Sequence, residues 1–140
     1  KWIIISSRGI VFMLRKVLAV LNRRTRVAGK NSWQGLKDAF ANEEAFKVQS
    51  ILCLILIPLA LVIAENYLQL LLLLCSLFLV LIIELLNTSI EMVVDRIGTE
   101  FHKLSGRAKD IGSAAVCLSM VVFILVWSTV IAQNFGVLAY

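Results

Sequence analysis

Histidine, proline and cysteine are scarce in this sequence. His102 is the only histidine, Pro58 is the only proline, and the three cysteines, Cys53, Cys75 and Cys117, lie in apolar runs without a CxxC spacing. One histidine cannot build a histidine-based metal site within a single chain, and we interpret His102 as a surface hydrogen-bonding group. Cysteines in apolar runs are typical of small core residues. The scarcity therefore speaks against zinc, redox and disulfide chemistry.

Basic residues are also missing from long parts of the chain. No Lys or Arg occurs between residues 49 and 94 or after residue 110, and most of the fourteen lie within the first 47 residues. The positive-inside rule therefore places the N-terminal region and residues 96–109 in the cytoplasm, with the C-terminus outside, which requires an odd number of spans. These basic clusters lie beside apolar segments and lack interleaved aromatic residues. They favour anionic lipid and ATP phosphate, and no nucleic acid, as partners.

What the chain has in abundance is apolar side chains, which make up 60% of its 140 residues. This composition predicts an all-α membrane protein with three transmembrane helices, at about 48–64, 67–97 and 111–132. A separate soluble nucleotide-binding domain would need on the order of 100 residues, so any chemistry must come from the membrane helices and their connections. The spans belong to a predicted membrane domain of residues 32–140.

Residues 1–31 form a predicted basic, amphipathic N-terminal segment. The chain starts at Lys1 rather than Met, so residues 1–12 are left open as a fragment, upstream sequence or part of a longer N-terminus. Apolar residues between Met13 and Leu21 share a helical face beside basic residues, which predicts a helix lying on the inner leaflet. A frayed terminus is the alternative.

Two capping signals follow this segment. Asn31 or Ser32 is expected to begin a second surface helix, in which Trp33 suits the depth of the lipid headgroups. Asn42 is expected to cap the helix of the first span, with Glu43 in its first turn, where the helix dipole favours negative charge.

A polar stripe begins inside the second span. Glu84, Asn87 and Glu91 are spaced i, i+3 and i+7, so on one helix they share a face. At about 1.5 Å per residue from Tyr67, Glu84 lies roughly 25 Å along the helix, near the inner edge of the hydrocarbon core, and Glu91 lies about 10 Å further, among the headgroups. Polar groups at such depth are costly and usually functional, although helix packing through hydrogen bonds is the alternative for Glu84 and Asn87.

The stripe and its surroundings permit phosphoryl transfer from ATP to a lipid alcohol. Glu91 and Glu43 offer carboxylate oxygens to Mg²⁺, Lys109 offers a cation to phosphate, and Glu84 offers a base for the hydroxyl. A function of another class remains open, a non-enzymatic oligomer in which Glu84 and Glu91 line an ion or proton path.

Two long motifs carry a family resemblance. The run ELLNTSIEMVVDRIGTEFHKLSGRAKDIGSAAV, residues 84–116, and the run SWQGLKDAFANEEAF, residues 32–46, resemble the small bacterial integral-membrane diacylglycerol kinases. The resemblance covers about residues 32–127. It implies a homotrimer in the bacterial inner membrane, with cytoplasmic N-terminus and periplasmic C-terminus, that converts diacylglycerol to phosphatidic acid with ATP. Its active sites would be shared between neighbouring chains.

The resemblance also implies roles for individual residues. The matched positions are Glu84 as general base with Asn87 beside it, Glu43 and Glu91 as ligands of Mg²⁺, and Lys109 and Asp110 as nucleotide contacts. Arg24 and Lys30 lie before the matched stretch and are expected as further nucleotide contacts. Asp95 and Ser113 match polar positions of the family, and Gln49 stands where many members have Glu. One branch of the family phosphorylates undecaprenol, but the loop of residues 95–115 resembles the diacylglycerol branch.

Overall fold

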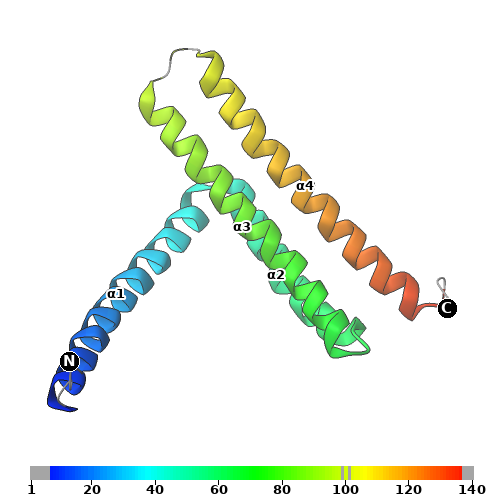
Figure 1. The fold of residues 1–140 in the computed structure, drawn as a ribbon. Coiled ribbons are helices and arrows are strands. Elements are labelled where there is room, and N and C mark those ends of the chain that lie inside the picture. The colour runs from blue at the N-terminus through cyan, green and yellow to red at the C-terminus, as the bar shows by residue number, and fades with distance from the viewer. Residues whose placement is uncertain (1–6, 99, 101, 137–140) are drawn as a thin grey trace, which may run out of the picture. The chain divides into compact units, whose positions relative to one another are not determined.

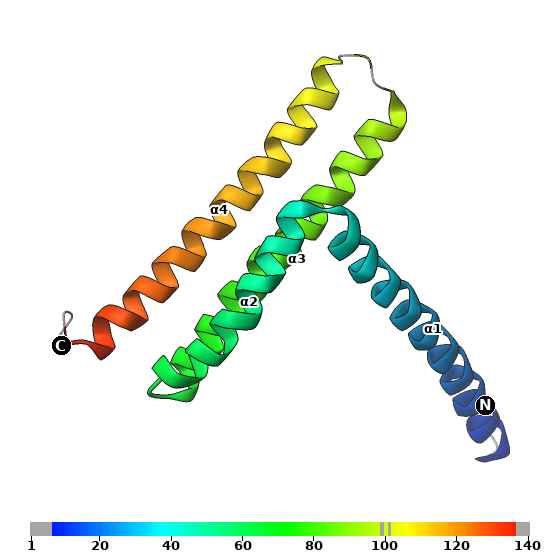
Figure 2. The same ribbon diagram turned by 180° about the vertical axis from the view of Figure 1, so that it is seen from behind.

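The computed structural model describes residues 7–98, 100 and 102–136, which form helices and no strand. In chain order the helices are α1 (Ser7–Asn42), α2 (Glu44–Ile63), α3 (Tyr67–Ile97) and α4 (Lys103–Asn134), shown in Figures 1 and 2. By length and composition, α2, α3 and α4 can each cross a membrane. The prediction of an all-helical protein with three apolar spans is thereby confirmed. The predicted third span, 111–132, lies within a longer helix.

The chain divides into two compact units, residues 1–38 and 39–140. In the first unit, α1 runs without a break past Asn31 and Ser32, so the expected start of a second helix there is wrong. Asn and Ser are tolerated inside a helix when no proline follows. The nearby Gly29 has open space around it, since a Cβ added there would have no described neighbour within 4 Å. Thr25 donates its hydroxyl hydrogen to the Leu21 carbonyl at 3.0 Å, which keeps it within the helical pattern.

The described side chains of the first unit are exposed from Arg15 onward. Near its end, the Lys37 ammonium lies 5.3 Å from the centre of the Trp33 ring. Residues 1–6, which belong to the predicted N-terminal segment, lie outside the described residues.

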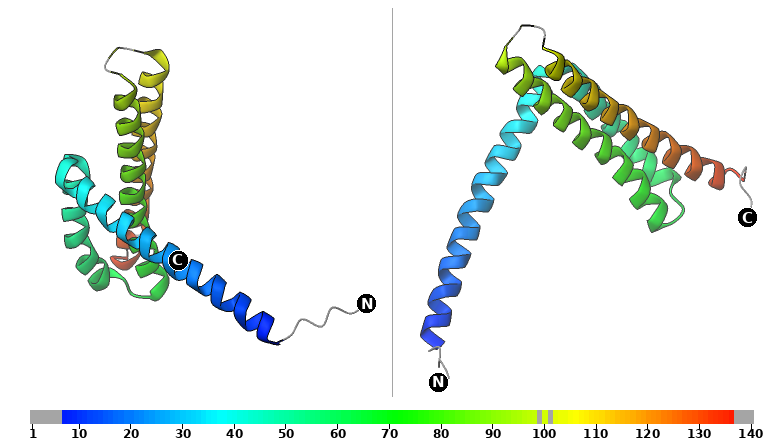
Figure 3. Two further views of the ribbon diagram at one scale, coloured as in Figure 1. Left: turned by 90° about the vertical axis from the view of Figure 1, so that its left-hand side faces the viewer. Right: turned by 45° about the horizontal axis from the view of Figure 1, so that its top comes forward.

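The second unit contains the three apolar helices. α3 packs against both α2 and α4, and Figure 3 shows α3 and α4 running side by side in opposite directions. The core joins all three helices and consists of Cys53, Ala60, Leu73, Leu77, Trp127 and Val130. Outside this core many apolar side chains stay exposed, among them Leu54 at 71% and Val62 at 82%. Such surfaces suit hydrocarbon or a neighbouring membrane helix, so α2–α4 fit a bilayer.

Amide side chains join the three helices at the α2–α3 turn. The Asn134 Nδ2 of α4 donates to the Ile63 carbonyl of α2 at 2.7 Å, and the Gln69 Nε2 of α3 donates to Asn134 Oδ1 at 2.9 Å. Asn66 caps α3 by accepting the Gln69 backbone N–H at 3.0 Å. These bonds fix the helix ends and thereby the register of α3 against α4.

Replacing Asn134 with Leu is expected to lower the free energy of unfolding by about 1–3 kcal/mol, because the Ile63 carbonyl and the Gln69 amide lose a part-buried partner. Thermal unfolding of the purified protein in detergent micelles, followed by circular dichroism, measures the change. Gln133→Leu, at an exposed position one residue earlier, is the matched control. Equal effects of the two substitutions would show that the hydrogen bonds at the turn add nothing to stability.

Candidate active site on the C-terminal half of α3

The predicted polar stripe of α3 lies on a face that is covered by other helices. Glu84 is 5% exposed and Asn87 is 9% exposed, although both belong to a helix rich in Leu, Ile and Val. Glu91, further along the same face, is half-buried. Buried polar side chains need hydrogen-bond partners, and two of the three side chains of the stripe are buried.

Glu84 has its partner on α2. The Gln49 Nε2 donates a hydrogen bond of 2.8 Å to Glu84 Oε2, which joins residues 35 positions apart. Because Gln49 begins the apolar part of α2 and Glu84 lies in the apolar part of α3, the bond forms where water is scarce and a hydrogen bond is electrostatically stronger than in water. Sequence reasoning missed this pair; the available signal was a lone amide in an apolar segment, which needs a partner.

Asn87 lies between Glu84 and Glu91 on the stripe and is hydrogen-bonded to Glu91. Its Nδ2 donates to Glu91 Oε1 at 3.0 Å, while its Oδ1 is buried and has no hydrogen-bond partner among the described residues. This Oδ1 faces Gly112 of α4 so closely that a Cβ at position 112 would collide with it. Gly112 is itself buried. The small residue therefore lets α4 approach the amide of Asn87.

The substitution Gly112→Ala is expected to destabilise the protein by about 1–3 kcal/mol, because the amide of Asn87 must turn away and leave Glu91. Thermal unfolding in micelles measures this loss. Gly106→Ala, on the same helix with no atom within 4 Å of its added Cβ, is the control and should be neutral or stabilising. The double variant Gly112→Ala/Asn87→Ala tests this cause, because it removes the amide with which the new Cβ would collide. If its stability equals the sum of the two single effects, the collision with Asn87 does not cause the loss of stability in Gly112→Ala.

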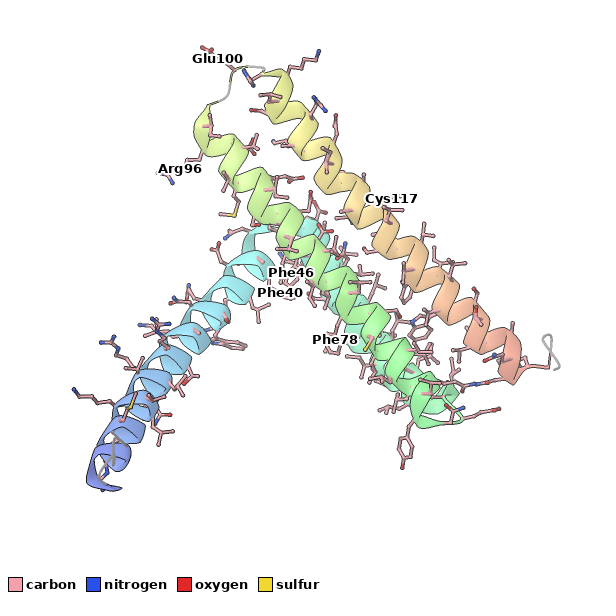
Figure 4. All side chains as sticks on the ribbon, in the orientation of Figure 1. Phe40, Phe46, Phe78, Arg96, Glu100 and Cys117 are labelled. Carbon is pink, nitrogen blue, oxygen red and sulfur yellow. The ribbon has the colours of Figure 1, made fainter. Side chains whose placement is uncertain are left out.

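The connection between α3 and α4 brings opposite charges together. Lys109 Nζ pairs with Asp95 Oδ1 at 2.5 Å, with the side chains 39% and 64% exposed. Asp110, the predicted companion of Lys109, is exposed. Arg96 and Glu100 lie at the same connection (Figure 4). An ion pair this exposed contributes little to stability, so the Lys109 ammonium stays accessible to a competing anion.

The remaining predicted site residues lie on α1 or at its end. Glu43 is the N-cap residue of α2, half-buried and without a side-chain cap hydrogen bond, so the expectation that Asn42 caps a helix already containing Glu43 is wrong by one residue. Asn42 instead ends α1. Arg24 and Lys30 are exposed on α1 in the first unit. In the part of the chain that the structure describes, no three His, Cys, Asp or Glu side chains form a metal-binding group.

These features define a class of protein. Three helices able to span a membrane enclose a stripe of carboxylate and amide groups, which leads from the apolar zone to charged residues at the α3–α4 connection. Polar and ionisable groups inside membrane helices are typical of functional sites, and this arrangement fits a membrane protein that acts on lipid.

Comparisons with known proteins identify the family. Residues 30–131 match the family described as prokaryotic diacylglycerol kinase. Similar proteins named diacylglycerol kinase occur in Haemophilus influenzae, 49% identical over 102 residues (73% of this chain and 86% of the relative), and in Escherichia coli K12, 44% identical over 105 residues (75% and 86%). A relative of that name in Pseudomonas aeruginosa is 39% identical over 100 residues (71% and 81%).

The chain belongs to the prokaryotic diacylglycerol kinase family. The predicted family and enzyme class are thereby confirmed, and the alternative of a non-enzymatic conducting oligomer is not favoured.

Proposed function

We propose that this protein transfers the γ-phosphate of ATP to the free hydroxyl of diacylglycerol, producing phosphatidic acid and ADP. The observation that carries the proposal is the buried carboxylate of Glu84, held by a hydrogen bond between apolar helices in a chain of the diacylglycerol kinase family. A carboxylate at this depth meets the hydroxyl of a lipid at the edge of the hydrocarbon core.

Glu84 is the proposed general base. The hydroxyl oxygen of the lipid forms a bond to the γ-phosphorus, the bond from that phosphorus to the β–γ bridging oxygen breaks, and ADP leaves with that oxygen. The hydroxyl proton goes to the Glu84 carboxylate, whose Oε2 already accepts from Gln49. Asn87 lies one helical turn further and orients Glu91.

Glu91 and Glu43 are the proposed protein ligands of Mg²⁺. Hard carboxylate oxygens suit this ion, and it usually keeps water and phosphate oxygens as its other ligands, so two carboxylates are a sufficient protein contribution. Glu91 Oε1 accepts from Asn87, and a carboxylate retains further lone pairs for a cation. When bound, Mg²⁺ would neutralise charge on the transferring phosphate.

Lys109, Asp110, Arg24 and Lys30 are the proposed nucleotide contacts. Lys109 can exchange its exposed partner Asp95 for a phosphate oxygen, because the ion pair costs little to break. Asp110 accepts hydrogen bonds from hydroxyl or amino groups of the nucleotide. Arg24 and Lys30 add positive charge from α1.

The site is proposed to be completed in a homotrimer in the bacterial inner membrane. The exposed apolar faces of α2–α4 leave ample surface for contact with neighbouring chains and lipid. The distribution of basic residues supports a cytoplasmic position for the α3–α4 connection and the N-terminus, where ATP is available, and a periplasmic position for the C-terminus.

The test is transfer of labelled γ-phosphate from Mg-ATP to dioleoylglycerol by the purified protein in mixed micelles, with undecaprenol offered in parallel. Labelled phosphatidic acid that requires both ATP and Mg²⁺ is the expected product. A strong preference for undecaprenol would overturn the choice of substrate. Absence of transfer to either lipid alcohol would overturn the proposed activity.

A further inference from the structure

Gln49 contacts the proposed base but has no part in the chemistry described so far. Its Nε2 lies 2.8 Å from Glu84 Oε2, and its own Oε1 is buried without a hydrogen-bond partner among the described residues. We propose that Gln49 is a positioning residue for phosphate transfer, which holds the Glu84 carboxylate in one orientation and leaves its second oxygen to receive the substrate proton. This inference rests on the proposed role of Glu84.

The orientation of the Gln49 amide follows from its surroundings. If the amide were rotated by half a turn, its oxygen would lie against Glu84 Oε2, and two acceptors at that distance repel each other. A hollow of about 240 Å³ beside Gln49 offers no competing partner, because its other lining residues are aliphatic, aromatic or sulfur-containing, for example Leu52, Leu77 and Phe123. The amide therefore directs its N–H at Glu84 even though its own oxygen remains unpaired.

This contact gives Glu84 what a general base needs. A glutamate side chain has several freely rotating bonds, and productive proton transfer requires it to stay within hydrogen-bond reach of one hydroxyl. The bond from Gln49 ties one carboxylate oxygen to α2, so the other oxygen has a defined direction. Because an amide donates without releasing its proton, Gln49 supports the carboxylate without competing for the proton that Glu84 accepts.

Other charged groups on α2, α3 and α4 could also act on the Glu84 carboxylate, but those nearest along these helices have other contacts or are exposed. Lys47 lies 6.0 Å from the centre of the Phe40 ring, Glu91 accepts from Asn87, Lys109 pairs with Asp95, and Asp110 is exposed. Gln49 is thus the described side chain that donates a hydrogen bond to the Glu84 carboxylate, and its replacement should act on that carboxylate directly.

Two substitutions separate positioning from mere packing. Gln49→Met keeps the length of the side chain and removes the donor; kcat for dioleoylglycerol should fall about tenfold to a hundredfold, with KM for both substrates within about twofold. Gln49→Glu places two carboxyl groups where they must share a proton. This variant should remain active, but the acid limb of its kcat against pH should move upward by about one pH unit or more, since Glu84 accepts the substrate proton only after the shared proton has left.

Gln133→Met is the matched control, because it makes the same chemical change at an exposed position of α4 and should leave the kcat and the pH profile as they are. Thermal unfolding of each variant in micelles reports folding. A Gln49→Met enzyme with unchanged kcat, or an active Gln49→Glu enzyme with the pH profile of the wild type, would overturn the inference. If Gln49→Met does not fold, the profile of Gln49→Glu decides alone. Failure of the wild type to phosphorylate dioleoylglycerol would instead overturn the proposed function.

Discussion

Replacing Glu84 with Gln should lower kcat for dioleoylglycerol by about 10²–10⁴-fold, the usual contribution of a general base. The substitution keeps the shape of the side chain and removes its ability to take a proton. Glutamine at position 84 can also accept the hydrogen bond from Gln49 or donate to the unpaired Gln49 Oε1, so the packing of α2 on α3 should survive. Initial rates with labelled ATP in mixed micelles, over a range of lipid concentrations, measure the change.

The control for this experiment is Glu65→Gln, which makes the same substitution at an exposed position on the α2–α3 turn. It should keep the full rate. KM for Mg-ATP should stay within about twofold of the wild-type value in Glu84→Gln, since the base acts on the lipid hydroxyl and not on the nucleotide. A Glu84→Gln enzyme that retains more than about a tenth of the wild-type kcat would assign Glu84 to helix packing rather than to proton transfer.

The spans and the polar stripe could be predicted because both depend on local rules. Long apolar runs free of charge define membrane helices, and the predicted second span, residues 67–97, coincides with α3. Spacings of three and four residues place Glu84, Asn87 and Glu91 on one face, whatever the helix packs against. The start of α3 also depends on a residue next to it in the sequence, because the side chain of Asn66 caps the helix.

The partners of the stripe could not be predicted, because they depend on how separate helices are aligned. The bond between Gln49 and Glu84 and the approach of Gly112 to Asn87 both require a particular register of α2 and α4 against α3. That register depends on the packing of the core and on the amide contacts of Asn134, which a local pattern does not contain. The predicted helix starts at Asn31 or Ser32 and at Asn42 were wrong for a related reason, since residues that favour caps are also tolerated inside a helix.

The geometry also supports the different roles proposed for the two carboxylates of the stripe. Glu84 is 5% exposed and accepts from a neutral amide of α2. Glu91 is half-buried, lies nearly two turns closer to the charged α3–α4 connection, and accepts from Asn87 on its own helix. A desolvated carboxylate suits proton transfer with a lipid hydroxyl, whereas a carboxylate near water suits a hydrated cation and phosphate.

Replacing Glu91 with Gln should therefore change the response to metal rather than proton transfer. We expect the Mg²⁺ concentration for half-maximal activity to rise about tenfold or more, and kcat at saturating lipid to fall about 10²-fold, because an amide oxygen binds a hard cation more weakly than a carboxylate. The amide oxygen still accepts from Asn87, so the stripe should keep its geometry. Titrating Mg²⁺ at a fixed ATP concentration in the mixed-micelle assay measures both effects.

Glu100→Gln, in the α3–α4 connection, is the control, because it removes an exposed carboxylate near the same end of α3 (Figure 4). It should leave the Mg²⁺ dependence as in the wild type. A Glu91→Gln enzyme that is slow but responds to Mg²⁺ like the wild type would mean that Glu91 positions Asn87 and holds no metal. A shift in Mg²⁺ dependence for Glu91→Gln but not for Glu84→Gln would instead separate the metal ligand from the base along a single helix face.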